Sequence, residues 1–66
     1  MNIKKLKGKM VELDISIDKL AELLGKNKAT IYRRFSKPET ITIGEAMCIK
    51  AALNLSDEDA SEIFLN

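Results

Sequence analysis

Residues 16–36, SIDKLAELLGKNKATIYRRFS, hold two short amphipathic segments on either side of a glycine. In the first segment, the apolar Leu20 and Leu24 are four residues apart, which predicts a helix over about 17–24 with one apolar face. Gly25 follows at the place where a residue in the left-handed conformation commonly ends a helix. The sequence therefore predicts a short helix that stops at the glycine.

The second segment predicts another short helix. Asn27 is expected to be its N-cap, and Ile31 and Phe35 are expected to form its inward face over about 28–35. Two short helices joined by a turn of three or four residues that contains glycine form a helix-turn-helix. In that motif the second helix enters the major groove of DNA.

These residues resemble the DNA-binding domain of lambdoid phage repressors and Cro proteins, a small all-α fold of five helices. The matching residues are Leu20, Ala21, Leu24, Gly25 and Ile31. The likeness continues through residues 40–64, which are similar to the fourth and fifth helices of that family. The resemblance implies one compact, lambda-repressor-like domain over residues 1–66, with the helix-turn-helix at its second and third helices.

The remaining helices are predicted from apolar spacing and from capping residues. The first helix is expected over about 2–13, with an apolar stripe that consists of Ile3, Leu6, Met10 and Leu13. Pro38 predicts a loop over 36–40, since proline disfavours helical geometry in the residue before it. Thr42 and Glu45 predict a capping box for a fourth helix over about 43–53. Its expected inward residues are Ile43, Ala46, Ile49 and Leu53.

A second capping box, formed by Ser56 and Asp59, predicts the start of a fifth helix. Acidic residues in the first turn favour this helix further, because they lie near the positive end of its dipole. The expected buried residues of the fifth helix are Ala60, Ile63 and Phe64.

Composition restricts the class of protein. A chain of 66 residues is one domain with little room for a deep substrate pocket, and it contains no apolar run that predicts a membrane span or a signal peptide. The single Cys48 fits a reducing cytoplasm. The resemblance to phage proteins implies that this is the cytoplasm of a bacterial host. Histidine is absent, which excludes a Cys/His zinc site and histidine-based catalysis. Carboxylate or lysine chemistry stays open on composition alone, but the small size of the chain leads us to expect neither an enzyme nor a cofactor or metal.

Charge is divided unevenly along the chain. Residues 1–37 hold ten Lys/Arg against four acidic residues, a net charge of +6, while residues 38–66 carry a net charge of −5. The basic half contains the expected reading helix, which favours a nucleic-acid partner. The simpler interpretation is that small helical proteins often carry uneven solvated charge.

A helical wheel with Ile31 on the core predicts which side chains of the second segment could read bases. Ala29 and Arg33 face away from the core, Thr30 and Tyr32 lie beside them, and Lys28 is at the tip of the helix. The expected base-reading residues are Lys28, Ala29, Thr30, Arg33 and Tyr32. An arginine can bind guanine O6 and N7 with two hydrogen bonds, and small methyl groups can contact thymine. The role of Tyr32 stays undecided between a DNA contact and packing over a neighbouring loop.

Phosphate contacts are expected on the flanks, where free amides at helix starts and basic side chains bind anions. The expected phosphate-binding residues are Ser16, Asn27, Ser36, Lys37, Lys9 and Arg34. Ser16 and Asn27 also serve as N-caps. The role of Lys9 stays undecided between a phosphate contact and a solvated side chain that binds nothing. The partner of the Arg34 guanidinium stays undecided between a phosphate and a carboxylate.

The sequence favours a sequence-specific regulator of transcription that binds double-stranded DNA, either a phage-type repressor or a Cro-like protein. Two copies are expected on a pseudo-palindromic operator, as a homodimer at least on DNA, with Phe64 and Leu65 as the expected surface of contact. The simpler interpretation is that these two side chains complete the core. The alternative is a protein-interaction module of the same fold, antitoxin-like or anti-repressor, that uses the acidic C-terminal half. Met1 and the absence of a linker after Leu65 favour a complete small protein.

Overall fold

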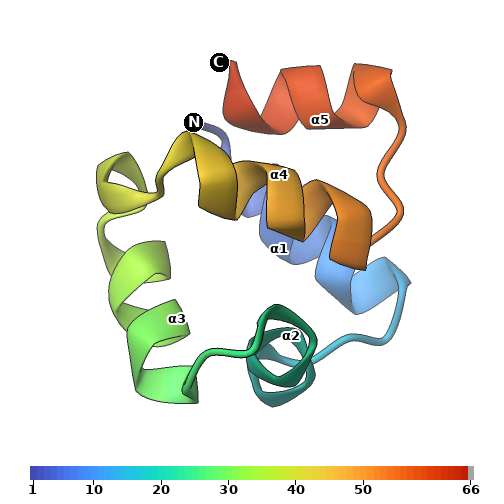
Figure 1. The fold of residues 1–66 in the computed structure, drawn as a ribbon. Coiled ribbons are helices and arrows are strands. Elements are labelled where there is room, and N and C mark those ends of the chain that lie inside the picture. The colour runs from blue at the N-terminus through green and yellow to red at the C-terminus, as the bar shows by residue number, and fades with distance from the viewer. Residues whose placement is uncertain (66) are drawn as a thin grey trace.

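Capping residues and apolar spacing produce five α-helices in the computed structural model, which describes residues 1–65 (Figure 1). The elements are α1 (Ile3–Glu12), α2 (Ile17–Leu24), α3 (Lys28–Ser36), the 3₁₀ helix η1 (Pro38–Thr40), α4 (Ile43–Ala52) and α5 (Asp57–Phe64). No strand occurs among these residues. The prediction of a compact all-α domain with five helices is confirmed, whereas η1 lies in the stretch that was expected to be a loop.

Each α-helix begins at a side chain that accepts a hydrogen bond from the backbone of its first turn. These N-caps are Asn2, Ser16, Asn27, Thr42 and Ser56. Thr42 and Glu45 form the complete capping box that was predicted, with bonds of 3.0 and 2.9 Å. The box at Ser56 is only half formed, because the Asp59 carboxylate pairs with Lys9 on α1.

Three helices are followed, within two residues of their last residue, by a residue in the left-handed conformation. Gly25 has φ 66°, as the sequence predicts, and the same conformation occurs at Asp14 (φ 57°) and Asn54 (φ 50°). The Lys26 amide donates to Ala21 O (3.0 Å) and the Gly25 amide to Glu22 O (3.2 Å), which is the Schellman arrangement. The equivalent two bonds are formed by the amides of Asp14 and Ile15 after α1, and by the amides of Asn54 and Leu55 after α4. Aspartate and asparagine adopt this conformation more readily than other side chains, because their short polar groups bond locally.

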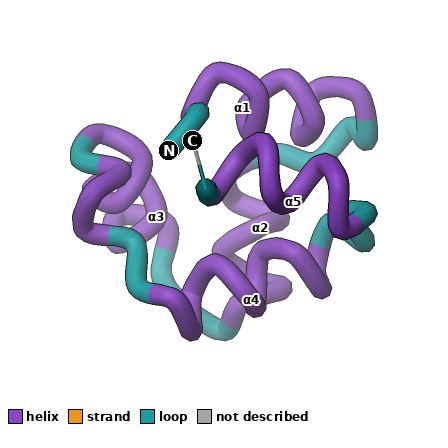
Figure 2. Tube along the Cα trace, turned by 90° about the horizontal axis from the view of Figure 1, so that it is seen from above, coloured by secondary structure: helices purple, strands orange, loops and turns teal. Residues whose placement is uncertain are grey.

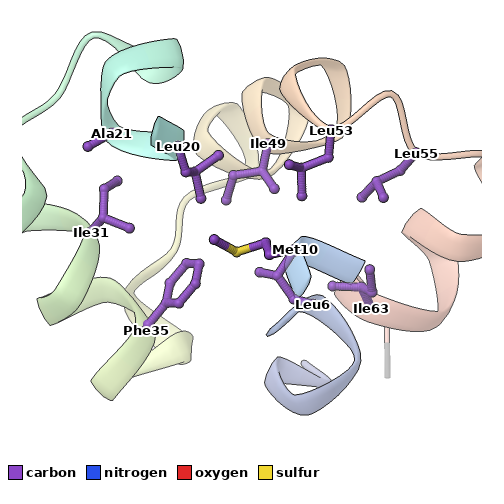
Figure 3. Close-up of a cluster of buried hydrophobic side chains, with 10 residues drawn as sticks. All are labelled: Leu6, Met10, Leu20, Ala21, Ile31, Phe35, Ile49, Leu53, Leu55 and Ile63. Atoms are coloured by element: carbon purple, nitrogen blue, oxygen red, sulfur yellow. The ribbon is translucent and has the colours of Figure 1, made fainter. Parts of the chain in front are cut away.

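The core draws apolar side chains from every α-helix (Figure 3). Met10 extends from α1 into the middle of the cluster, between side chains of α2, α3 and α4. Ile31 and Phe35 anchor α3, as predicted. The buried residues are Leu6, Met10, Leu20, Ala21, Ile31, Phe35, Ile49, Leu53, Leu55 and Ile63.

The helix α2 packs against both α3 and α4, and α1 lies beside α5 (Figures 1 and 2). The Asn2 amide donates a 2.7 Å hydrogen bond to the Ile63 carbonyl, so the two ends of the described chain lie side by side. In both views α3 stands at one edge of the molecule. Its outward face is therefore not covered by another helix.

The prediction that Ile43 faces inward is wrong, because its side chain is 83% exposed. Glu45 turns toward α3 and back to the Thr42 amide, and Ile43 is two residues away, about 200° around the helix. The first turn of α4 therefore directs Ile43 to solvent. Leu13 is also half exposed, since α1 ends at Glu12 and the buried part of its stripe ends at Met10.

Candidate nucleic-acid interface

The outward face of α3 carries the side chains that the sequence predicts there. Lys28, Ala29, Tyr32 and Arg33 are exposed, and Thr30 is half-buried. The core residues Ile31 and Phe35 fix the rotation of the helix about its own axis. The side chains expected to read bases are therefore brought together on one solvent-facing surface.

Hydrogen bonds link three side chains along this face. Asn27 Oδ1 accepts from the Thr30 amide (2.9 Å) and from the Thr30 hydroxyl (3.0 Å). Thr30 Oγ1 in turn accepts from Arg33 Nη2 (3.3 Å). This chain holds the Arg33 guanidinium along the helix, and its remaining N–H groups are free for an acceptor.

The stretch around α3 is purely cationic. Residues 23–38 contain Lys26, Lys28, Arg33, Arg34 and Lys37 and no carboxylate. Lys28, Arg33 and Lys37 have no ion-pair partner within residues 1–65. Their charges are therefore available to an external anion.

Arg34 behaves differently from its neighbour. Its Nε lies 3.1 Å from both carboxylate oxygens of Glu45, and Lys26 Nζ lies 3.7 Å from the same carboxylate. The hydrogen bond from the Thr42 amide, together with Arg34, lowers the pKa of the Glu45 carboxyl against the effect of burial. Of the two partners left open for Arg34, a carboxylate is the one it contacts, and this pair joins α3 to the start of α4.

Lys9 faces α5 rather than the surface around α3. Its Nζ lies 3.0 Å from Asp59 and 3.5 Å from Glu12, while Lys5 pairs with Glu62 and lies 3.7 Å from Asp59. The hydrogen bond to Asp59 raises the pKa of Lys9, and that to Glu62 raises the pKa of Lys5. The structure thus brings Lys9 into contact with carboxylates of its own chain.

A hollow of about 430 Å³ lies beside the outward face of α3, between α1, the start of α2 and the end of α3. Ser16, Tyr32 and Ser36 line it together with Lys7, a residue that the sequence analysis does not select. Lys7 and Lys9 are two residues apart and so lie on opposite flanks of α1. Helical phase separates the two lysines, and only the packing of α1 in the fold places Lys7 on the α3 side and Lys9 on the α5 side.

Asn27 and Lys37 mark the two ends of α3. Asn27 caps its start, and Lys37 is an exposed residue at its end whose amide donates to Arg33 O (3.1 Å). Ser16 caps α2, with its Oγ 3.1 Å from the Lys19 amide. Of the six expected phosphate-binding residues, these three and Ser36 are exposed around α3, whereas Lys9 and Arg34 contact carboxylates.

Within residues 1–65, no group of three or more Cys, Asp or Glu side chains could hold a metal ion. None of the helices in that range is long and apolar enough to cross a membrane. Comparison of the chain with protein-family models, with curated proteins and with solved structures finds no match.

Proposed function

We propose that this protein is a sequence-specific regulator of transcription that binds double-stranded DNA. In this proposal the five helices form a lambda-repressor-like domain, and α2 and α3 are its helix-turn-helix. One observation supports it most: the exposed face of α3 presents Lys28 and Arg33, and neither has a carboxylate of residues 1–65 as an ion-pair partner. A positive helix face at the edge of a small domain suits the major groove.

Arg33 and Lys28 would donate to base edges, with guanine as the partner that a guanidinium binds through two hydrogen bonds. Ala29, Thr30 and Tyr32 would contact neighbouring bases, including the methyl group of thymine. Ser16, Asn27, Ser36 and Lys37 would bind phosphates on either side, and Lys7 would add a cation on the α1 flank. Arg34 would act in this scheme by fixing α3 against Glu45.

Regulation would be steric. A domain seated on an operator that overlaps a promoter blocks access of RNA polymerase, as in phage-type repressors and Cro-like proteins. An isolated domain of this size has few base contacts, so two copies on a pseudo-palindromic site would supply the affinity of a specific complex.

The alternative, a protein-interaction module that uses the acidic C-terminal half, has weaker support. Asp57 pairs with Lys50, Asp59 pairs with Lys9 and Lys5, and Glu62 pairs with Lys5. Much of the acidic charge is therefore balanced by lysines of the same chain. Glu58 and Glu39 are exposed acids without an ion pair in the described residues, and they lie on different elements.

The test is selection from duplexes that contain about 20 random base pairs, enough for two half-sites. Fluorescence anisotropy would then compare a selected duplex with a random one at roughly 50 and 200 mM salt. We expect the selected duplex to bind at least about a hundredfold more tightly, with a salt slope that counts the phosphate contacts. Equal weak binding to both duplexes would reject the proposal.

A further inference from the structure

One carboxylate of α4 reaches the basic stretch around α3. Of the five basic side chains in residues 23–38, Lys26 and Arg34 have an ion-pair partner within residues 1–65, and both share Glu45. Arg34 Nε lies 3.1 Å from each carboxylate oxygen, and Lys26 Nζ lies 3.7 Å from Oε2. These three residues are called the Glu45 cluster.

The Glu45 cluster joins three parts of the fold. Lys26 belongs to the turn between α2 and α3, Arg34 to the second half of α3, and Glu45 to the first turn of α4. The Glu45 carboxylate also accepts from the Thr42 amide (2.9 Å), so every one of these contacts ends on the same two oxygens. The cluster therefore couples the position of α3 to the start of α4.

Apolar side chains enclose the carboxylate, which is only 12% exposed with its side chain. A crevice of about 10 Å³ remains between the three charged residues, at the lower limit of the space that one water molecule needs. Partly buried ion pairs of this kind are screened less than pairs on an open surface. The apolar residues that line the crevice are Leu24, Ile31, Phe35, Ile41 and Ile49.

The two cations of the cluster are held by Glu45 but are not buried. Lys26 is 40% and Arg34 is 33% exposed, so each can turn to an external anion once the carboxylate loses its charge. Lys26 directly precedes Asn27, and Arg34 is one turn from Lys37. Asn27 and Lys37 are both expected phosphate contacts, so Glu45 neutralises positive charge beside both ends of α3.

Phosphate contacts and base contacts depend on charge in different ways. Affinity for DNA of any sequence grows with the number of cations that displace counterions, whereas discrimination comes from the edges of the bases. A cation that is free to bind phosphate in any register adds affinity without adding discrimination. A cation that is held by Glu45 instead fixes the helix that carries the base-reading side chains.

We propose that Glu45 is a positioning residue that sets sequence specificity, because it keeps Lys26 and Arg34 from phosphates and holds α3 against α4. This inference deepens the proposed function and rests on it, since it takes double-stranded DNA as the partner of α3. Without the charge of Glu45, the chain binds DNA of any sequence more tightly and discriminates between sequences less well.

Glu45→Gln tests the proposal, because it removes the charge and keeps an oxygen that can accept from the Thr42 amide in the capping box. The matched control is Glu58→Gln on α5, which raises the net charge equally at an exposed carboxylate without an ion pair in the described residues. Fluorescence anisotropy compares both variants with the natural chain on a selected and a random duplex, at roughly 50 to 200 mM salt. Circular dichroism should show the same helix content for all three chains.

For Glu45→Gln on the random duplex, one additional free cation should steepen the salt slope by about 0.9 and tighten binding roughly tenfold at the lowest salt. The selected duplex should gain less, because the new phosphate contact is offset by a looser α3. The ratio of the two affinities should therefore fall by roughly threefold or more. Glu58→Gln should keep the natural slope and ratio. A purely structural role of Glu45 would lower stability and leave both quantities unchanged, which would overturn the proposal.

A measurement on the natural chain tests the same contact without a substitution. The Nε–H group of Arg34 donates to Glu45, so its NMR signal should move far less than that of Arg33 when the random duplex is added. Equal shifts of both signals overturn the proposal. Equal binding of both duplexes by the natural chain would reject the proposed function instead. A steeper slope for Glu45→Gln on the random duplex would then still support the hold of Glu45 on the two cations.

Discussion

The helices α1 and α3 are both rich in basic residues, but their charges meet different surroundings. On α1, Lys5 and Lys9 contact Asp59 and Glu62 of α5. On α3, Lys28 and Arg33 extend into solvent without an ion-pair partner in the described chain. The difference arises from topology, because α5 lies beside α1 and no acidic helix lies beside the outward face of α3.

This contrast shows that a count of charges along a sequence does not give the charge that a surface offers. The net charge of +6 in residues 1–37 includes lysines that the acidic C-terminal half neutralises in the folded domain. What remains available is concentrated around α3. The following predictions test whether the two basic helices differ in this way.

The largest expected effect is on DNA binding by Arg33→Ala. Loss of a bidentate base contact costs about 1–3 kcal/mol, so affinity for a selected duplex should fall by roughly ten- to a hundredfold. Fluorescence anisotropy measures this loss, and Lys9→Ala is the matched control on α1. We expect less than about a threefold change for Lys9→Ala, because its charge is already paired. Equal losses for both variants would remove the distinction between the two helices.

Glu45→Ala should lower the stability of the domain and release Arg34. Glu45 completes the α4 capping box and accepts from Arg34, and its side chain is only 12% exposed. Loss of a cap and of a charged hydrogen bond should reduce the free energy of unfolding by about 1–3 kcal/mol. Urea denaturation measures this change, with the exposed Glu39→Ala as control. Unchanged stability would show that α3 is held by its core residues alone.

Gly8→Ala should strengthen α1 without altering the surface around α3. An added Cβ at Gly8 meets no atom within 4 Å, and glycine inside a helix costs about 0.5–1 kcal/mol relative to alanine. Thermal melting should therefore shift upward by roughly 2–8 °C. Gly25→Ala serves as the opposite control, because φ at Gly25 is +66° and alanine is strained there. A lower melting temperature for Gly8→Ala would contradict this reading of α1.

The smallest expected effect is on the pH dependence of stability. The hydrogen bond from Lys9 lowers the pKa of Asp59. The ionised Asp59 therefore stabilises the folded state. This stabilisation is complete above the pKa of Asp59 in the unfolded chain, about 4, and is lost as the pH falls through its lower pKa in the folded protein. The pKa of Lys9 is raised in the folded protein. The stabilisation from the charged Lys9 is therefore complete below about pH 10 and is lost as the pH rises through the pKa of Lys9 in the folded protein.

Thermal melts between about pH 2 and 7 should show a shallower acid slope for Asp59→Asn than for the natural chain. Glu58→Gln, which changes an exposed carboxylate with no ion pair in the described residues, should keep the natural slope. The same slope in Asp59→Asn and the natural chain would mean that the contact between α1 and α5 is not electrostatic.

The positions of the helices could be predicted because their signals are local. The prediction of 17–24 for α2 agrees with Ile17–Leu24, and that of 28–35 for α3 is one residue short of Lys28–Ser36. An N-cap starts each helix and Gly25 separates the two, so the signals that set these bounds act on residues within four positions along the chain. The inward Ile31 and Phe35 follow from spacing alone.

The features that could not be predicted depend on neighbours distant in sequence. The outward direction of Ile43 follows from the contact of Glu45 with α3, and the pairing of Lys9 follows from the position of α5. Lys7 and Lys9 look alike in the sequence, and only the packing of α1 decides which one lies near α3. The left-handed conformations of Asp14 and Asn54 were missed because neither position holds a glycine.

The hydrogen bond between Asn2 and Ile63 joins residues at nearly opposite ends of the described chain, which bears on the order of folding. Closing so long a loop costs more entropy than the contacts among α2, α3 and α4, which are neighbours in sequence. We expect these three helices to form the nucleus and the α1–α5 seam to close last. Substitutions along the seam would then mainly accelerate unfolding, whereas substitutions in α2–α4 would slow folding.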